Sequence, residues 1–191
     1  MKKIFTLRNV LILAGALLAI LVFVFSFLAV CKTEGDLLGT HYVSRVYNII
    51  WGANKSKTVA GNNTEIRKFD DAYPAAGLPL VGAILVLVGG LCALVVVLLG
   101  DKLFKNEKVA KIVLLAAGGL MLVGGVFHFF INSAFADVMV KQANSEYFTK
   151  QDALDMLKDE KASYGLVIVS GILAVLGGLS IAASQFLPNK K

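Results

Sequence analysis

Four long runs of apolar residues dominate this sequence. They cover about residues 10–30, 75–99, 112–135 and 164–187, and none has Asp, Glu, Lys or Arg in its interior. About 20 consecutive apolar residues are needed to cross the hydrocarbon core of a bilayer, whereas buried helices of soluble proteins are usually shorter. The pattern therefore predicts a membrane protein with four spanning helices, organised as one domain over residues 1–191.

Two long polar segments, 31–74 and 136–163, separate the apolar runs. In the first of them, residues 40–51 are rich in β-branched and aromatic side chains, which favour strands. Two more short β-prone stretches follow at 57–60 and 64–69, with Gly and Asn residues between them that favour turns. We therefore expect a small antiparallel sheet from this segment. On its first strand, four side chains share one face at a period of two: Val43, Tyr47, Ile49 and Trp51.

The second long polar segment predicts helix. The third apolar helix is expected to continue beyond the membrane through Ala136 and Val140. Further on, Thr149 followed by Asp152 resembles a helix-capping arrangement, so a short helix is expected to begin there. Its apolar side chains would pack on the sheet or on a partner protein: Ala153, Leu154, Met156 and Leu157.

The distribution of Lys and Arg predicts the orientation of the helices. The N-terminus, the short connection 100–111 and the C-terminus hold nine basic residues in short segments, against two acids, Asp101 and Glu107. The two long polar segments hold ten basic and eleven acidic residues, at a much lower basic density. Short basic segments stay in the cytoplasm. We therefore expect cytoplasmic termini, extracellular long segments and a location in the plasma membrane.

Composition supports the membrane interpretation. The chain is 57% hydrophobic, above the roughly 45–50% of soluble domains. The net charge of +6 would suggest nucleic-acid binding in a soluble protein. Here the topology accounts for the basic residues, so no nucleic-acid partner is expected.

A lipoprotein signal sequence is the alternative interpretation of the first apolar run, with Cys31 as the modified residue. Val30 argues against it, since a small residue is preferred before such a cysteine. The run is also longer than the roughly 7–15 apolar residues of a signal peptide. A spanning helix is therefore favoured, and the mass of the intact protein distinguishes the two.

Glycines indicate how the helices pack. In the second, third and fourth apolar runs they recur seven residues apart, which places each pair on one helix face. Small residues let helices approach closely in hydrocarbon, so these three helices are expected to pack tightly. The pairs are Gly82 with Gly89, Gly118 with Gly125, and Gly171 with Gly178.

The apolar runs also resemble one another in pairs. Gly89–Leu91 matches Gly177–Leu179 at an offset of 88, and Phe25–Phe27 resembles Phe127–Phe129 at an offset of 102. Two explanations are open: a parallel duplication of a two-span hairpin, or chance similarity between apolar sequences.

This layout resembles the claudin and peripheral-myelin-protein superfamily in its four spans, its β-prone first outer segment and its short basic inner turn. That superfamily carries Gly-Leu-Trp followed by two cysteines in the first outer loop, and Trp51 stands in a comparable place. Between Lys32 and Pro74 this chain has no cysteine, so the loop disulfide is absent. The resemblance implies a four-helix bundle with an extracellular sheet and an adhesion, scaffolding or accessory role.

Residues with catalytic or ligand-binding potential are few. His128 lies within a predicted span and is expected to be a structural, hydrogen-bonded side chain, with a proton-relay or ligand role as the alternative. Cys31 and Cys92 do not form a disulfide framework. The sequence has no phosphate-binding loop, nucleophile elbow or metal-ligand cluster, so we expect no enzymatic activity, cofactor or metal. Asn54 and Asn62 begin triplets that match glycosylation acceptors.

These observations favour a non-enzymatic membrane protein that acts as a scaffold, adhesion module or accessory subunit. It would contact the bilayer and a membrane-protein partner, or associate with itself. A small transporter or channel subunit that works as an oligomer is the alternative. The candidate contacts with a partner are the side chains of Tyr47, Ile49, Trp51, Leu154 and Leu157.

Overall fold

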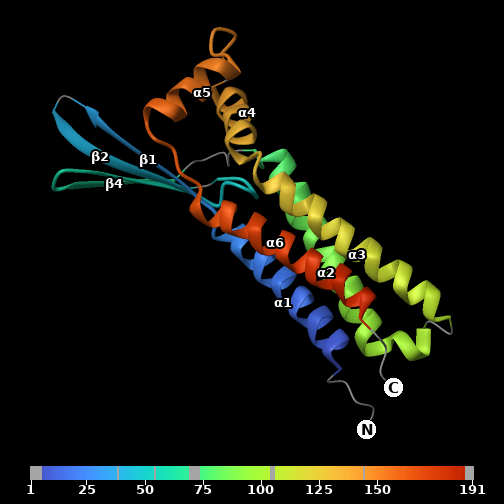
Figure 1. The fold of residues 1–191 in the computed structure, drawn as a ribbon. Helices are drawn as coiled ribbons and strands as arrows, with labels where there is room; N and C mark the ends of the chain where they lie inside the picture. The colour runs from blue at the N-terminus through green and yellow to red at the C-terminus, as the bar shows by residue number, and fades with distance from the viewer. Residues whose placement is uncertain are drawn as a thin grey trace. The chain divides into compact units, whose positions relative to one another are not determined.

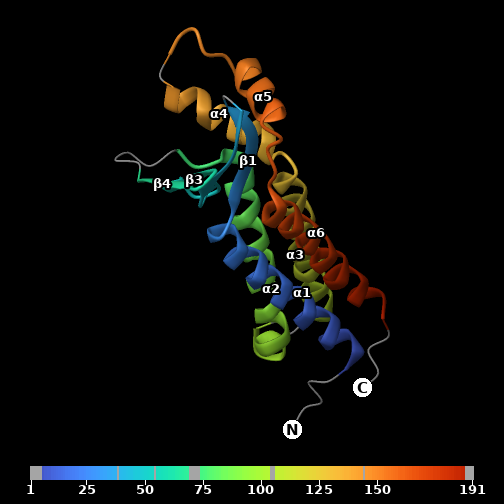
Figure 2. The same cartoon turned by 90° about the vertical axis from the view of Figure 1, so that its left-hand side faces the viewer.

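The computed structural model describes residues 6–37, 39–53, 55–68, 74–103, 106–143 and 145–187 (Figures 1 and 2). Its elements follow one another along the chain as α1 (Leu7–Phe27), β1 (Val30–Leu37), β2 (Thr40–Tyr47), β3 (Lys55–Ala60), β4 (Asn63–Lys68), α2 (Gly77–Leu103), α3 (Glu107–His128), α4 (Ile131–Ala143), α5 (Lys150–Asp159), α6 (Gly165–Ala183) and the 3₁₀ turn η1 (Ser184–Phe186).

The chain forms two compact units, which we describe separately. The bundle unit comprises Met1–Val24, Val81–His128 and Ser170–Lys191. The sheet unit comprises Phe25–Leu80 and Phe129–Val169. Helices α1, α2 and α6 contribute residues to both units.

Among the residues that the structure describes, four helices are long and apolar enough to span a membrane, in agreement with the predicted number of spans. They are Leu7–Phe27, Gly77–Gly100, Glu107–His128 and Gly165–Phe186. The third differs from the predicted range of 112–135 because helix α3 ends at His128 and a turn at Phe129 and Phe130 precedes α4. No Gly or Pro marks this break, and the sequence stays apolar across it, so hydropathy alone could not locate it.

Close backbone approach joins α2 to α3 in the bundle unit. A Cβ atom added at Gly82 would lie 2.6 Å from the carbonyl oxygen of Gly124, and one added at Gly124 would lie 2.6 Å from that of Gly82. Two helical turns further along α2, a Cβ at Gly89 would lie 2.6 Å from the carbonyl oxygen of Ala117. Only glycine permits this spacing, because any larger residue would meet backbone atoms of the facing helix.

Helix α3 packs against α6 through a second glycine face. A Cβ at Gly118 would lie 2.9 Å from the carbonyl oxygen of Gly178, and one at Gly125 would lie 2.9 Å from that of Gly171. The six glycines singled out by their spacing of seven are therefore placed at helix contacts. Apolar side chains fill the rest of this core, among them Ile12, Val22, Val86, Leu114, Met121 and Ile181.

The sheet unit contains a four-stranded antiparallel sheet in which sequence neighbours pair, in the order β1-β2-β3-β4. This confirms the predicted sheet, although β1 was not anticipated. Lys32, Glu34 and Asp36 make β1 look like a polar loop in the sequence, whereas Cys31 and Thr33, which alternate with them, are buried. Strand β2 ends at Tyr47 and does not continue to residue 51.

A two-residue turn connects β3 to β4. Ala60 pairs with Asn63 across the turn, and Gly61 has a φ of +55°. Positive φ at the first central position is the conformation of a type II′ hairpin turn, where glycine is favoured. Phe69, the last residue of the third predicted β-prone stretch, lies outside the described residues.

Helices α4 and α5 complete the sheet unit. Thr149 and Asp152 form the expected capping box: the Asp152 amide donates to Thr149 Oγ1 and the Thr149 amide donates to Asp152 Oδ2 at 2.8 Å. Apolar side chains from the first strand, the 48–53 turn and these helices share one core that includes Cys31, Ile49, Ile50, Ile131, Phe135, Leu157 and Tyr164.

Candidate interaction site

The two edges of the sheet differ. At the β1 edge, Lys32 N–H donates to Ser163 O at 3.0 Å, Ser163 N–H donates to Lys32 O at 2.8 Å, and Glu34 N–H donates to Glu160 O at 2.8 Å. The segment 160–163 therefore covers this edge at Lys32 and Glu34 through an isolated antiparallel bridge and one further backbone hydrogen bond. Tyr42 supports the closure: its pKa is raised, first by desolvation and then by the adjacent Glu160 carboxylate, with which its hydroxyl is hydrogen-bonded.

Among the residues that the structure describes, the β4 edge has no such cover. Within the described ranges, no strand pairs with the outer side of β4. Its residues 63–66 are all exposed, and the Ile66 side chain is 55% exposed. An open edge of this kind is a template for pairing with another chain.

The alternation of an antiparallel pair identifies which β4 residues offer backbone groups at the open edge. Residues one and three positions beyond a hairpin's closing pair point their N–H and C=O groups away from the partner strand. The β1 edge shows the same alternation. Its closing pair is Leu37 with Thr40, and the outward bonds are made by Glu34 and Lys32, three and five positions before Leu37. In β4 the corresponding residues are Thr64 and Ile66.

The candidate contacts around Trp51 are placed differently from the sequence expectation. Ile49 is buried in the core of the sheet unit, so it offers no surface to a partner. The Trp51 indole is half-buried: Nε1–H donates to Ser26 Oγ at 2.7 Å, and the ring stacks on Phe27 with centroids 4.7 Å apart. Tyr47 is also half-buried, with Lys55 Nζ 5.8 Å from its ring centroid.

On α5, Leu157 is buried and Leu154 is half-buried, both within the core of the sheet unit. These two side chains therefore pack on the protein's own core, which was one of the two roles expected for this helix. The exposed apolar side chains of this unit include Ile66 on β4, Tyr147 in the connection before α5, and Met156 on α5. Sequence reasoning missed Ile66, which stands alone between charged neighbours, although its place on the last β-prone stretch was a usable signal.

Cys31 is a free cysteine in the core and is chemically protected. Burial is the largest influence on it and raises the pKa of the thiol to about 12, while a hydrogen bond with Tyr164 acts in the opposite direction. Tyr164 in turn donates from its hydroxyl to Asn132 Oδ1 at 3.1 Å. Cys31 is therefore a packing residue, since only the thiolate is nucleophilic.

His128 is fully buried in the bundle unit. Its Nδ1 lies 2.8 Å from the carbonyl oxygen of Gly124, which fixes Nδ1 as the protonated nitrogen because a carbonyl can only accept. Nε2 is buried without a hydrogen-bond partner among the described residues. Over the same residues, no group of three or more His, Cys, Asp or Glu side chains could hold a metal ion.

Comparison with known proteins finds no protein-family model that matches this chain and no match among proteins with curated descriptions.

Proposed function

We propose that this protein is a non-enzymatic membrane scaffold or accessory subunit that binds a membrane-protein partner through the β4 edge of its sheet unit. The contrast between the two sheet edges carries the proposal. The chain covers the β1 edge with its own segment 160–163, yet β4 presents exposed residues at its outer side. An extended segment of a partner can add to such an edge by main-chain hydrogen bonds, with side chains supplying specificity.

The proposal includes a location and an orientation. The protein would reside in the plasma membrane with both termini in the cytoplasm and the sheet outside the cell, because basic residues concentrate in the terminal and 100–111 segments. A claudin-like role in adhesion or scaffolding fits the four candidate spans combined with a sheet between α1 and α2.

The transporter or channel alternative requires polar side chains that line a path. Several polar side chains of the candidate spans instead bond within the protein. Ser180 donates to Leu11 O at 3.0 Å, Ser184 donates to Ile181 O at 2.6 Å, and Trp51 donates to Ser26. These polar groups are used for bonds inside the protein, and the Ser180 bond joins α6 to α1, which favours the scaffold.

Edge variants test the proposal. Thr64→Pro removes a backbone donor at the outer side of β4, where proline is tolerated, and Ile66→Glu places a charge there. Met156→Glu is the matched control, since it alters another exposed apolar side chain of the same unit. After mild-detergent purification, native mass spectrometry should show a stoichiometric partner with the unaltered protein and Met156→Glu, reduced at least several-fold in both edge variants.

Two results would contradict this proposal. One is equal partner recovery from all variants with unchanged melting temperatures. The other is a homo-oligomer, free of any other protein, that conducts solute flux after reconstitution into vesicles.

A further inference from the structure

A cavity of about 300 Å³ opens in the bundle unit where α1 and α3 begin and α6 ends. Its volume is at the lower end of the range for small-molecule sites, roughly 300–1,000 Å³. Three parts of the chain that are distant in sequence supply its lining: Arg8, Glu107, Lys108, Lys111, Gln185 and Leu187.

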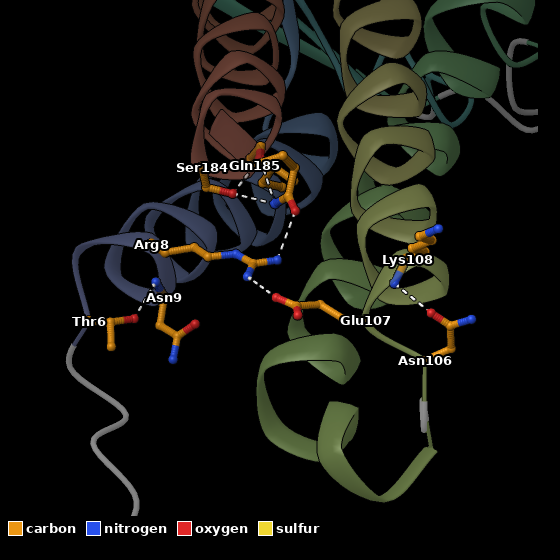
Figure 3. Close-up of polar contacts among 9 residues, drawn as sticks. Thr6, Arg8, Asn9, Asn106, Glu107, Lys108, Ser184 and Gln185 are labelled. Atoms are coloured by element: carbon orange, nitrogen blue, oxygen red, sulfur yellow. Dashed lines mark hydrogen bonds and ion pairs between the residues drawn. The ribbon is translucent and has the colours of Figure 1, made fainter. Parts of the chain in front are cut away.

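Arg8 is held at this cavity by a fixed partner. Its side chain is only 15% exposed, and Nη2 donates to Gln185 Oε1 at 3.0 Å. Gln185 is itself buried and anchored, since its Nε2 donates to Ser184 Oγ at 2.6 Å. Figure 3 shows the guanidinium extending between Gln185 and Glu107. A guanidinium has five N–H donors in a planar fork, so Arg8 can serve a further acceptor without giving up Gln185.

The charge of the lining is unbalanced. Arg8, Lys108 and Lys111 are cationic, and Glu107 is the one acid among the residues that line the cavity. The Glu107 carboxylate is 71% exposed and lies 3.6 Å from Arg8 Nη1, which is beyond hydrogen-bonding distance. An anion that enters the cavity would therefore compete with this carboxylate for Arg8.

Apolar side chains adjoin the charged lining. Phe186 is 80% exposed, and Lys111 Nζ lies 5.9 Å from its ring centroid. Leu7 and Ile112, the sequence neighbours of Arg8 and Lys111, are also largely exposed. These residues lie at the ends of candidate membrane-spanning helices. Cationic and exposed apolar side chains therefore lie close together there, as they do in proteins at the level of the lipid headgroups.

We propose that this cavity is a phosphate-binding site, in which Arg8 and Lys111 bind the oxygens of a phosphate ester. Arg8 supplies a bidentate fork and Lys111 a mobile point charge. Two sources provide this chemistry: the headgroup of an anionic phospholipid, whose acyl chains would lie along Leu7, Ile112 and Phe186, and free inorganic phosphate.

Native mass spectrometry of the full chain tests the site, with phosphatidylglycerol as the anionic probe and phosphatidylcholine as the zwitterionic one. Lys111→Gln should weaken phosphatidylglycerol binding about five-fold, and Arg8→Gln at least as much. Glu107→Gln should strengthen binding several-fold, because it removes the competing carboxylate. Lys158→Gln, an exposed lysine on α5, is the matched control and should leave binding unchanged.

The Glu107→Gln variant keeps the test decisive even where Arg8→Gln fails to fold. Inorganic phosphate distinguishes the sources: phosphate that binds and excludes phosphatidylglycerol, with the same dependence on Lys111, identifies free phosphate, and lipid binding that persists in excess phosphate identifies the headgroup. The proposal is overturned by unchanged affinity in Lys111→Gln and Glu107→Gln, or by an equal loss in Lys158→Gln.

Discussion

Asn48 determines where the Trp51 indole lies. Its φ of 60° is left-handed, a conformation that asparagine adopts more readily than most residues. The strand β2 ends just before it, and the chain then turns so that Ile49 and Ile50 enter the core. The Trp51 ring consequently stacks on Phe27 and bonds to Ser26 at the end of α1.

Trp51→Phe therefore separates the hydrogen bond from the stacking. Phenylalanine keeps an aromatic ring against Phe27 but leaves Ser26 Oγ without the indole donor, which should cost about 1 kcal/mol. Trp51→Ala removes both contacts and should cost about 3 kcal/mol or more. Thermal unfolding in detergent measures both variants. Equal stability of Trp51→Phe and Trp51→Ala would show that stacking contributes nothing.

Cys31 should resist alkylation in the folded protein. Burial raises its pKa from 9.0 to about 12, so almost no thiolate exists at pH 8–9. In a Cys92→Ser background, iodoacetamide should modify Cys31 rapidly only after unfolding, as followed by mass spectrometry. Because the folded pKa is raised, this group stabilises the fold fully below pH 9, and its contribution should be lost between pH 9 and about 12. Rapid labelling of folded protein at pH 8 would contradict this assignment.

At the scale of elements, the sequence predicted best where one physical signal was strong. Apolar length located four helices, and the Thr149–Asp152 spacing located the start of α5. Two features depended on tertiary context and were missed. Strand β1 is held by β2 and by the segment 160–163, although its own sequence is charged. The open β4 edge became visible only after the other edge was found to be closed.

Adjacent glycines on α3 provide a matched test of helix packing. A Cβ at Gly118 would lie 2.9 Å from Gly178 O, whereas a Cβ at Gly119 would have nothing within 4 Å. Gly118→Ala should therefore destabilise the protein by about 1–3 kcal/mol, because α3 and α6 must move apart. Gly119→Ala should be neutral or stabilise the helix by up to about 1 kcal/mol. Unfolding in detergent compares them, and equal effects would rule out close packing at Gly118.

The glycine contacts also bear on the duplication suggested by the sequence. The offset of 88 relates α2 to α6, and the offset of 102 relates α1 to α3. Under these offsets, a contact between α2 and α3 has an equivalent between α6 and α1, and a contact between α1 and α2 has an equivalent between α3 and α6. These recurring contacts agree with a duplication of a two-helix hairpin, one of the two explanations that the sequence leaves open. The equivalent contacts are Gly89 with Ala117 and Gly177 with Gly15, and Gly90 with Ala16 and Gly178 with Gly118.

At the scale of the whole molecule, orientation in the membrane is the prediction with the widest consequences, since it decides which compartment the β4 edge faces. Single cysteines introduced into a Cys31→Ser, Cys92→Ser background report it. Ser145 lies in the exposed connection between α4 and α5, and Asn106 in the exposed connection before α3.

On intact cells, a membrane-impermeant maleimide should label Ser145→Cys at once. It should label Asn106→Cys only after permeabilisation, because the basic 100–111 segment is expected to stay in the cytoplasm. Asn106 Oδ1 accepts a hydrogen bond from the Lys108 amide at the start of α3. Asn106→Cys removes this bond and should cost about 1 kcal/mol of stability, but it should not change the orientation of the helices. The reverse labelling pattern would place the β4 edge in the cytoplasm and any partner there with it. Labelling of both sites on intact cells would require an even number of membrane crossings between them, in conflict with α3 as a single span.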